Sequence, residues 1–321
     1  MTNLLDIQNL KTYFYLEEQV LKAVDDVSFS IRPKEIVAIV GERGCGKSTA
    51  ALSILKLISP PGKIVGGKIN FNDTDLLKLG NKQLRKIRGN NISMIFQEPL
   101  SCLNPTLTIG NQILEAVFTH KSISKAQAYK DTIDMLKTVG LQDQERIFNT
   151  YPHQLSGGMQ QRAMIAMALI TKPQLLIADE PTTALDVTIQ AQILYLLKTL
   201  QRKLNMSILL ITHDLSIVAQ IAQRVIIMYA GEIVEEADVK QVFASPLHPY
   251  TEALLKSVPN LKKEKGKLEV IPGSVPNPAE FPTGCRFHPR CREADRICKK
   301  VKPGLFEVKK QHLVRCLKRQ G

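Results

Sequence analysis

Tryptophan is absent from this 321-residue chain, and aromatic residues make up only 5% of it. Proteins that bind single-stranded nucleic acid commonly stack bases on aromatic side chains, so nucleic acid is not expected as a partner. Long apolar runs are also missing, because the longest, residues 164–170, is far shorter than the roughly 18 residues that a membrane-spanning helix needs. The first eleven residues contain Asp6 and no basic-then-apolar pattern, which disfavours a signal peptide. A soluble or peripheral protein is therefore expected.

Basic residues outnumber acidic ones. Forty-three Lys and Arg residues against thirty Asp and Glu residues give a formal net charge of +13, and residues 262–321 are rich in the basic ones. A solvated basic surface is the simplest explanation. Attraction to anionic lipid headgroups is the second. Nucleic-acid binding is the third and is disfavoured by the scarcity of aromatic residues.

Cysteine is sparse and unevenly distributed. Cys45 and Cys102 lie in the first third of the chain, and the other four lie close to its end: Cys285, Cys291, Cys298 and Cys316. Their spacing does not fit the paired C-x2-C motifs of a zinc ribbon. Four thiolates can hold a [4Fe–4S] cluster or a structural Zn²⁺, and free thiols or disulfides are the third reading. His288 is a candidate substitute ligand.

Strands and helices alternate along most of the chain. The apolar pattern predicts helices at 47–57 and 189–204, and strands at 23–31, 36–40, 92–96, 175–178, 207–211, 225–228 and 233–234. Helical spacing over 108–171 indicates an inserted helical subdomain, about residues 98–171. After about residue 258, a charged linker and several prolines predict an irregular, Cys-rich extension. This order is typical of an α/β fold with a mostly parallel sheet.

Residues 41–48 fit the phosphate-binding pattern G-x-x-x-x-G-K-[ST] without a mismatch, after a predicted strand and before a predicted helix. The backbone N–H groups of such a loop surround a phosphate, and the helix N-terminus favours an anion. Lys47 is expected to reach the β- and γ-phosphates, and Ser48 to bind Mg²⁺. The sequence therefore predicts a P-loop NTPase core. Its expected ATP contacts are Gly41, Arg43, Gly44, Cys45, Gly46, Lys47, Ser48 and Thr49.

Two acids, Asp179 and Glu180, follow the apolar run 175–178. Burying adjacent carboxylates at a strand end is costly unless a cation or a reaction requires them. Asp179 is suited to the Mg²⁺ shell, and Glu180 to polarising an attacking water. An ordinary strand-to-turn edge would explain this segment alone, but the P-loop upstream favours the catalytic interpretation.

Residues 155–162 resemble the signature motif of the ABC ATPases and read Leu155-Ser156-Gly157-Gly158-Met159-Gln160-Gln161-Arg162. The resemblance implies that this motif opens a helix and binds the γ-phosphate held by a second protomer. A hydroxyl and two N–H groups at a helix N-terminus make such an anion site. The implied contacts to ATP on the partner protomer are Ser156, Gly157, Gly158 and Gln160.

Further segments resemble other elements of the same family. Gln97 corresponds to the Q-loop glutamine, which contacts Mg²⁺ and water, and His213 to the H-loop histidine, which holds the γ-phosphate. Residues 184–186 correspond to the D-loop, with Asp186 at the dimer interface. An aromatic residue stacks on adenine, and Phe14 fits the family offset better than Tyr13. The resemblance also implies an antiparallel N-terminal β-subdomain.

Three segments narrow the resemblance, which covers about residues 3–245. Residues 93–99, 151–159 and 248–251 are similar to the ATPases of di- and oligopeptide importers, and nickel importers share this branch. The branch implies a nucleotide-binding domain over 1–258 and an extension over 259–321. Some of its members carry a [4Fe–4S] cluster in this extension, which favours the cluster over Zn²⁺ for the four cysteines.

The family resemblance also implies partners, location and mechanism. Two ATPase subunits, in a heterodimer or alternatively a homodimer, close on ATP and Mg²⁺ and open after hydrolysis. They act beneath two integral membrane permease subunits at the cytoplasmic face of the cell membrane, and an extracytoplasmic substrate-binding protein takes part indirectly. A non-transport ABC ATPase is one rival interpretation, and this chain lacks the second cassette or long coiled-coil insertion usual there. An ABC subunit that binds ATP without turnover is the other, and Glu180 and His213 disfavour it.

Cys45 and Arg43 stand where small hydroxyl residues are more common in the family. The backbone cradle does not depend on these side chains. A helix N-terminus lowers the pKa of a thiol, so Cys45 is expected to be reactive.

Overall fold

The computed structural model describes residues 3–98, 102–183, 185–257 and 270–320. The chain forms two compact units, which are described separately. Unit 1 comprises Met1–Arg32, Ile36–Leu77 and Ile211–Gly321, and unit 2 comprises Pro33–Glu35 and Lys78–Leu210. In the described ranges, no helix combines the length and the apolar character that crossing a membrane requires.

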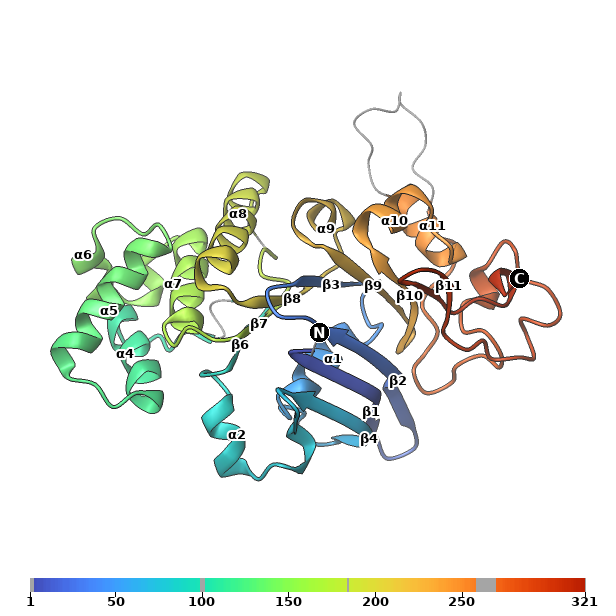
Figure 1. The fold of residues 1–321 in the computed structure, drawn as a ribbon, viewed down its shortest axis with the longest axis horizontal. Helices are drawn as coiled ribbons and strands as arrows, with labels where there is room; N and C mark the ends of the chain where they lie inside the picture. Colours follow the sequence, from blue (N-terminus) through green and yellow to red (C-terminus); the bar gives the residue numbers. More distant parts are fainter. Residues whose placement is uncertain (1–2, 99–101, 184, 258–269, 321) are drawn as a thin grey trace. The chain divides into compact units, whose positions relative to one another are not determined.

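An antiparallel sheet lies at the N-terminal end of unit 1 (Figure 1). Its strands run in the order β2-β1-β4-β5, with bounds β1 (Leu5–Tyr15), β2 (Val20–Ile31), β4 (Gly62–Phe71) and β5 (Thr74–Asp75). The register sets Leu5 opposite both Ile31 and Phe71. A buried hydrogen bond of 2.8 Å joins Thr12 of β1 to Ser53 of helix α1 (Lys47–Ile54). This sheet therefore packs on the helix that follows the P-loop.

A second set of strands in unit 1 leads into the P-loop. Their order is β11-β12-β10-β9-β3, with bounds β3 (Ile36–Val40), β9 (Arg224–Tyr229), β10 (Glu232–Asp238), β11 (Phe306–Lys309) and β12 (His312–Val314). Strand β3 is parallel to β9, whereas β10 is antiparallel to both β9 and β12. Every residue of β3 is buried, which accounts for the continuous apolar run predicted at 36–40.

Short helices complete unit 1. They are α9 (Leu215–Ile221), α10 (Val239–Ala244) and α11 (Pro249–Ser257), with 3-10 turns η1 (Leu76–Lys78) at the unit boundary, η3 (His288–Arg290) and η4 (Leu317–Arg319). Asp214 caps α9 and Asp238 caps α10, because each carboxylate accepts a hydrogen bond from a backbone N–H two residues later. Helix α9 packs on β3, and α10 packs on β9 and β10.

Unit 2 contains most of the helices. Its elements are α2 (Asn81–Ile87), β6 (Ile92–Ile95), α4 (Ile109–His120), α5 (Lys125–Thr138), α6 (Gln144–Phe148), η2 (Pro152–Gln154), α7 (Gly157–Leu169), β7 (Leu175–Asp179), α8 (Val187–Leu204) and the start of β8 (Ser207–Thr212). Strands β6 and β7 are parallel. Helices α4, α5, α6 and α7 pack on one another, as the green part of Figure 1 shows. The hydroxyls of Thr108 and Ser124 cap α4 and α5.

The described part of the C-terminal tail, residues 270–320, is more ordered than its sequence suggests. Its prolines predict irregular structure, and residues 270–287 have no helix or strand. Strands β11 and β12 nevertheless continue the sheet, because Val314 pairs with Glu235 of β10. These strands are four and three residues long, too short for a periodic signal. The tail is therefore fixed to unit 1 through the edge of β10.

Candidate nucleotide-binding site

The P-loop, residues 41–48, connects β3 to α1 in unit 1. The space around it requires glycine at two positions. A Cβ on Gly41 would lie 2.2 Å from the backbone oxygen of Met228, and one on Gly46 would lie 2.1 Å from that of Ala23. Gly46 also has a φ of +100°, which L side chains rarely adopt. The path of the loop therefore depends on these two glycines.

Lys47 is buried beneath the loop. Its ammonium donates hydrogen bonds to the carbonyl oxygens of Gly41 at 2.7 Å and Glu42 at 2.9 Å. A charged nitrogen is thus held beside the loop backbone, where a bound phosphate would meet it. The remaining residues expected to contact ATP are exposed or half-buried: Arg43, Gly44, Ser48 and Thr49.

The expectation that the helix N-terminus lowers the pKa of Cys45 is wrong. Its side chain is fully buried, and its sulfur lies 3.8 Å from the Lys47 ammonium. Burial raises the pKa of this thiol, although the charge of Lys47 opposes the rise. A helix N-terminus was expected to lower the pKa of this thiol, but its removal from water has the larger effect and raises the pKa.

Tyr13 and Phe14, the two candidates for adenine stacking, are neighbours on β1. Successive side chains of a strand point to opposite faces. The Tyr13 hydroxyl donates to Asp25 at 2.7 Å, and burial together with this bond raises the pKa of Tyr13. The Phe14 ring lies over β4, where a Cβ on Gly62 would be 2.7 Å from it. The two rings thus have different surroundings, and stacking on adenine stays a prediction for both.

The acidic pair lies in unit 2, at the end of β7. Asp179 and Glu180 are both buried, and Glu180 has a φ of +44°, which is uncommon for a residue with a side chain. The amide of Gln97 donates to the Glu180 carboxylate at 3.2 Å. The hydroxyl of Thr183 donates to the same oxygen at 2.9 Å. Gln97 and Glu180 are thus brought together, and Thr183 is a contact that the sequence analysis missed.

The signature segment begins α7 in unit 2. Ser156 is the N-cap residue and is exposed, with Gly157 and Gly158 in the first helical turn. The side chain of Gln160 is buried and donates to the carbonyl oxygens of Pro152 at 2.9 Å and Leu155 at 3.1 Å. It holds the loop before the helix, whereas Ser156 and Gly157 are open to solvent.

Two further predicted positions follow β7 and β8. Asp186 is the N-cap of α8, and its carboxylate accepts from the N–H of Ile189 at 2.9 Å. Its neighbour Ala184 in the predicted D-loop lies outside the described residues. His213 belongs to unit 1 and is exposed after the end of β8.

A groove of about 470 Å³ lies in unit 2, and Phe96, which precedes Gln97 in the sequence, lines it. Residues from β6, α4 and α7 line it, and the aromatic and sulfur-containing ones are Met94, Phe96, Cys102, Met164 and Met167. Flexible methionine side chains adapt to the shape of an apolar partner. The groove therefore has the lining expected of a docking surface for an apolar helix.

Comparison with known proteins agrees with this geometry. Residues 24–183 match the family described as ABC transporter, and residues 234–298 match the C-terminal region of oligopeptide/dipeptide transporters. The oligopeptide transport ATP-binding protein AppD of Bacillus subtilis is 53% identical over 98% of this chain and 97% of its own length. The chain belongs to the ATP-binding proteins of ABC transporters. The dipeptide transport ATP-binding protein DppD of Haemophilus influenzae is 49% identical over 95% of this chain and 92% of its own length.

Solved ATP-binding cassettes share the fold of this ABC ATPase. The MJ0796 cassette, in a dimeric post-hydrolysis state bound to ADP and Pi, has a TM-score of 0.66 and 30% identity over 73% of this chain and 98% of its own. The cbiO1 cassette of Clostridium perfringens has a TM-score of 0.65 and 26% identity over 76% and 92% of the two chains. The predicted P-loop fold and ATPase activity are confirmed by this membership.

The four cysteines of the tail lie in one region of this ABC ATPase. The N–H of Cys285 donates to the carbonyl of Cys298 at 2.8 Å. Burial, with smaller contributions from the other three thiols, raises the pKa of Cys285 to about 11. In the described ranges, however, no group of three or more His, Cys, Asp and Glu residues is arranged to hold a metal ion. The predicted metal site is therefore not confirmed.

Proposed function

We propose that this ABC ATPase powers the uptake of di- or oligopeptides across the cell membrane. The observation that carries the proposal is similarity over nearly the full length to peptide transport ATP-binding proteins, including the C-terminal region. Peptide selection belongs to other subunits, and this chain supplies the energy. In this proposal, residues 1–258 form the nucleotide-binding domain and residues 259–321 the extension.

The P-loop is proposed to bind the triphosphate. Lys47 would exchange its loop carbonyl partners for phosphate oxygens, which are stronger acceptors because they are charged. Ser48, Gln97 and Asp179 would hold Mg²⁺, which neutralises charge on the phosphates when bound. Phe14 is the first candidate for adenine stacking, and Tyr13 the second.

Glu180 is proposed to orient the attacking water. Gln97 and Thr183 both donate to one oxygen of its carboxylate, so the acceptor is fixed before water arrives. A carboxylate that is positioned in advance spends no free energy on reorganisation during the reaction. His213 would contribute the second contact to the γ-phosphate.

A second ATPase subunit is proposed to complete the pocket. Ser156 and Gly157 are exposed at the start of α7, so the N-terminal end of this helix is open to a phosphate that another chain holds. Gln160 would act by holding the loop before α7, and Asp186 by holding the start of α8 at the dimer interface. The partner is proposed to be non-identical, with a homodimer as the alternative. ATP favours closure because both halves bind it only in the closed state.

Two permease subunits are proposed to dock on the ATPase pair at the cytoplasmic face of the membrane. A short amphipathic helix from each would occupy the groove in unit 2, with apolar side chains against Met94, Phe96 and Met167. A substrate-binding protein outside the cell would act through the permeases. Phe96→Ser is expected to abolish co-purification with the permeases and to retain ATP binding. Equal recovery of Phe96→Ser and the unmodified chain with the permeases would overturn this docking surface.

The tail is proposed to hold a [4Fe–4S] cluster, with Zn²⁺ as the alternative. The donor chemistry fits, because four thiols, Cys285, Cys291, Cys298 and Cys316, share one region, where Cys298 is among the groups that raise the pKa of each of the other three. The cluster would stabilise the C-terminal tail, which has little apolar core, by cross-linking its four cysteines. Iron and sulfide analysis of anaerobically purified protein, with an absorption spectrum, tests the assignment. About four of each per chain supports the cluster, zinc alone supports the alternative, and neither overturns both.

Transport in vesicles tests the function as a whole. The chain, its permeases and its partner ATPase are reconstituted, and ATP-dependent uptake of a labelled dipeptide is measured. Glu180→Gln is expected to retain ATP binding and to reduce uptake by roughly 10²- to 10⁴-fold, the usual loss when a general base is removed. Glu115→Gln, an exposed change on α4, is the control. Uptake of nickel in place of peptides, or peptide uptake without ATP, would overturn the proposal.

A further inference from the structure

Glu42, the second residue of the P-loop, is held by side chains from two distant parts of unit 1. Its backbone N–H donates to the hydroxyl of Tyr250 on α11 at 3.0 Å. Its carboxylate accepts hydrogen bonds from both terminal nitrogens of Arg290, at 2.7 and 3.0 Å. Two parallel bonds fix orientation as well as distance. The backbone and the side chain of one loop residue are thus both held from outside the loop.

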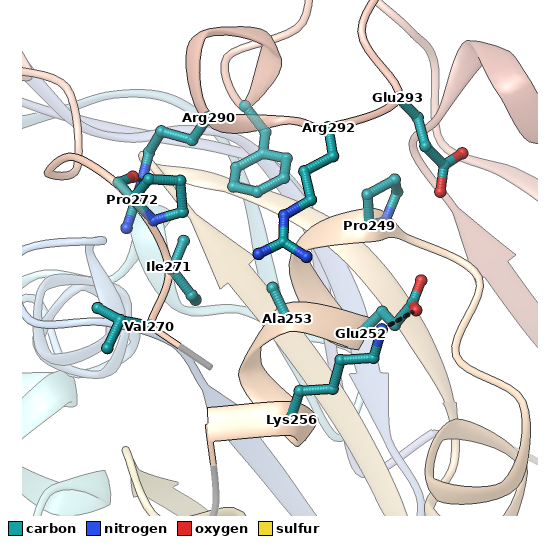
Figure 2. Close-up of a pocket in the computed structure, with 11 residues that line it drawn as sticks. Pro249, Glu252, Ala253, Lys256, Val270, Ile271, Pro272, Arg290, Arg292 and Glu293 are labelled. Carbon is teal, nitrogen blue, oxygen red and sulfur yellow. Dashed lines mark hydrogen bonds and ion pairs between the residues drawn. The ribbon is translucent and has the colours of Figure 1, made fainter. Parts of the chain in front are cut away.

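Arg290 is fixed by its own surroundings. Its side chain is only 5% exposed, and its Nε donates to the carbonyl oxygen of Pro272 at 2.8 Å. The guanidinium also lies 5.7 Å from the centre of the Tyr229 ring. Figure 2 shows Arg290 beside Pro272 at the edge of a cavity of about 130 Å³, which α11 and the tail line. These contacts hold the guanidinium at the P-loop.

The tail has a second arginine contact, on the N-terminal sheet. Arg286 is 8% exposed, forms an ion pair with Asp25 of β2 and donates to the carbonyl oxygen of Ala230 at 2.5 Å. Asp25 accepts the hydrogen bond from Tyr13, one of the two adenine-stacking candidates. The tail thus reaches the P-loop and strand β2 with two arginines that are four residues apart.

The charge of Glu42 explains why such a contact matters. A carboxylate in a phosphate-binding loop repels the triphosphate that the loop N–H groups attract. The positive charge of Arg290 cancels this repulsion. Only Arg290 of this pair is buried, because the Glu42 side chain is 29% exposed, and a partly exposed ion pair by itself adds little to stability. The Arg290–Glu42 pair is therefore better explained by its effect on anion binding than by its effect on folding.

We propose that Arg290 and Tyr250 are positioning residues for nucleotide binding. Arg290 neutralises Glu42 and fixes its side chain, while Tyr250 fixes its backbone, so that the P-loop is ready for phosphate. The proposal rests on the nucleotide role proposed for the P-loop. It gives the C-terminal tail a direct part in ATP affinity.

A charge-rescue experiment tests this proposal. Dissociation constants of Mg-ATP, Mg-ADP and adenosine are measured by calorimetry for the full-length chain and its variants. Arg290→Gln is expected to weaken Mg-ATP binding about tenfold, Mg-ADP binding less, and adenosine binding not at all, because the repulsion grows with phosphate charge. Adding Glu42→Gln to Arg290→Gln is expected to restore most of the affinity. Steady-state turnover should show a raised KM with kcat unchanged.

Tyr250→Phe provides a test that leaves all charges in place. It removes one hydroxyl from a fully buried ring, so the Glu42 N–H loses its partner, and Mg-ATP binding is expected to weaken about threefold. Arg296→Gln removes a similar charge from an exposed tail position and is the control.

The possible results separate this proposal from the one on which it rests. Unchanged affinity in folded Arg290→Gln and Tyr250→Phe, or loss that the second substitution does not rescue, would overturn the positioning role. Failure of the unmodified chain to bind nucleotide would instead overturn the nucleotide role of the P-loop. Equal weakening for adenosine and Mg-ATP would indicate a merely structural effect and would also count against the proposal.

Discussion

The P-loop and the C-terminal tail belong to the same unit, but the chain specifies them in opposite ways. The loop depends on its neighbours in sequence, with a buried strand before it, a helix after it and glycine at positions 41 and 46. The tail depends on distant partners, because Arg290 meets Glu42 across 248 positions and Arg286 meets Asp25 across 261. The P-loop can therefore be recognised from neighbouring residues in the sequence, whereas the tail residues that contact it cannot.

The same contrast separates their cysteines. Cys45 in the loop is buried beside Lys47, whereas two of the four tail cysteines, Cys285 and Cys291, are only partly buried. A thiol in the core serves packing, and its conversion to thiolate is disfavoured. Thiols gathered at a partly exposed position are accessible to metals and to oxidation. Position in the fold, more than residue type, therefore sets the chemistry available to each.

The largest loss of stability and of nucleotide binding is expected from a substitution in the P-loop itself. Gly46→Ala forces a Cβ to within 2.1 Å of the Ala23 oxygen at a φ of +100°. We expect a loss of about 3 kcal/mol or more in the free energy of unfolding and no measurable nucleotide binding. Urea unfolding and calorimetry measure the two effects.

Gly44→Ala is the matched control for that change. Gly44 also has a positive φ, of +79°, but a Cβ there meets no atom within 4 Å in the part of the chain that the structure describes. We expect a cost of only about 1 kcal/mol from backbone conformation. Equal losses for the two variants would mean that conformation, and not contact with β2, decides the shape of the loop.

A smaller change in stability is expected when His248, which precedes α11, is protonated. His248 accepts the N–H of Tyr250 on its Nδ1 at 3.0 Å, and burial lowers its pKa to about 4, although Glu235 opposes the shift. Because the unfolded chain protonates first, this contribution to stability is complete above about pH 6.5 and is lost as the pH falls toward 4. The loss is about 3 kcal/mol at most.

The pH dependence of urea unfolding measures this contribution. His248→Asn keeps a hydrogen-bond acceptor before α11 but removes the titration, so stability should fall less between pH 6.5 and 4 than in the unmodified chain. His153→Asn, an exposed change, is the control. Parallel curves for all three proteins would show that His248 is protonated as readily in the fold as in water.

The smallest effect concerns reactivity and leaves stability unchanged. The buried Cys45 thiol should react with a maleimide at least about tenfold more slowly in the native protein than in urea, because labelling requires local opening. Mass spectrometry of the peptide that contains Cys45 measures both rates, and Cys285 serves as the partly buried comparison. Rapid native labelling of Cys45 would contradict its placement in the core.

The sequence was sufficient where a feature is local. The strand predicted at 36–40 has those bounds as β3, and the buried acids follow β7 as expected. The P-loop pattern needs only a strand, glycines and a helix that are adjacent in the chain. Periodicity and spacing report such features directly because neighbouring residues form them.

The sequence was insufficient where the physics is long-range. The pKa of Cys45 was predicted from its helix terminus, whereas burial by distant residues decides it. The hydrogen bonds from Glu42 to Tyr250 and from Arg290 to Glu42 could not be predicted, because neither the P-loop sequence nor the C-terminal sequence contains a pattern that indicates them. Strand β12 escaped prediction because its three residues owe their conformation to pairing with β10.

Binding of Mg-ATP is the direct test of the nucleotide role proposed for the P-loop. Calorimetric titration of the unmodified chain should give saturable binding, and Lys47→Ala should weaken it by about 100-fold, because the buried ammonium would no longer meet the phosphates. Lys34→Ala, a change at an exposed lysine, should bind like the unmodified chain. Equal affinity of Lys47→Ala and the unmodified chain would contradict the account.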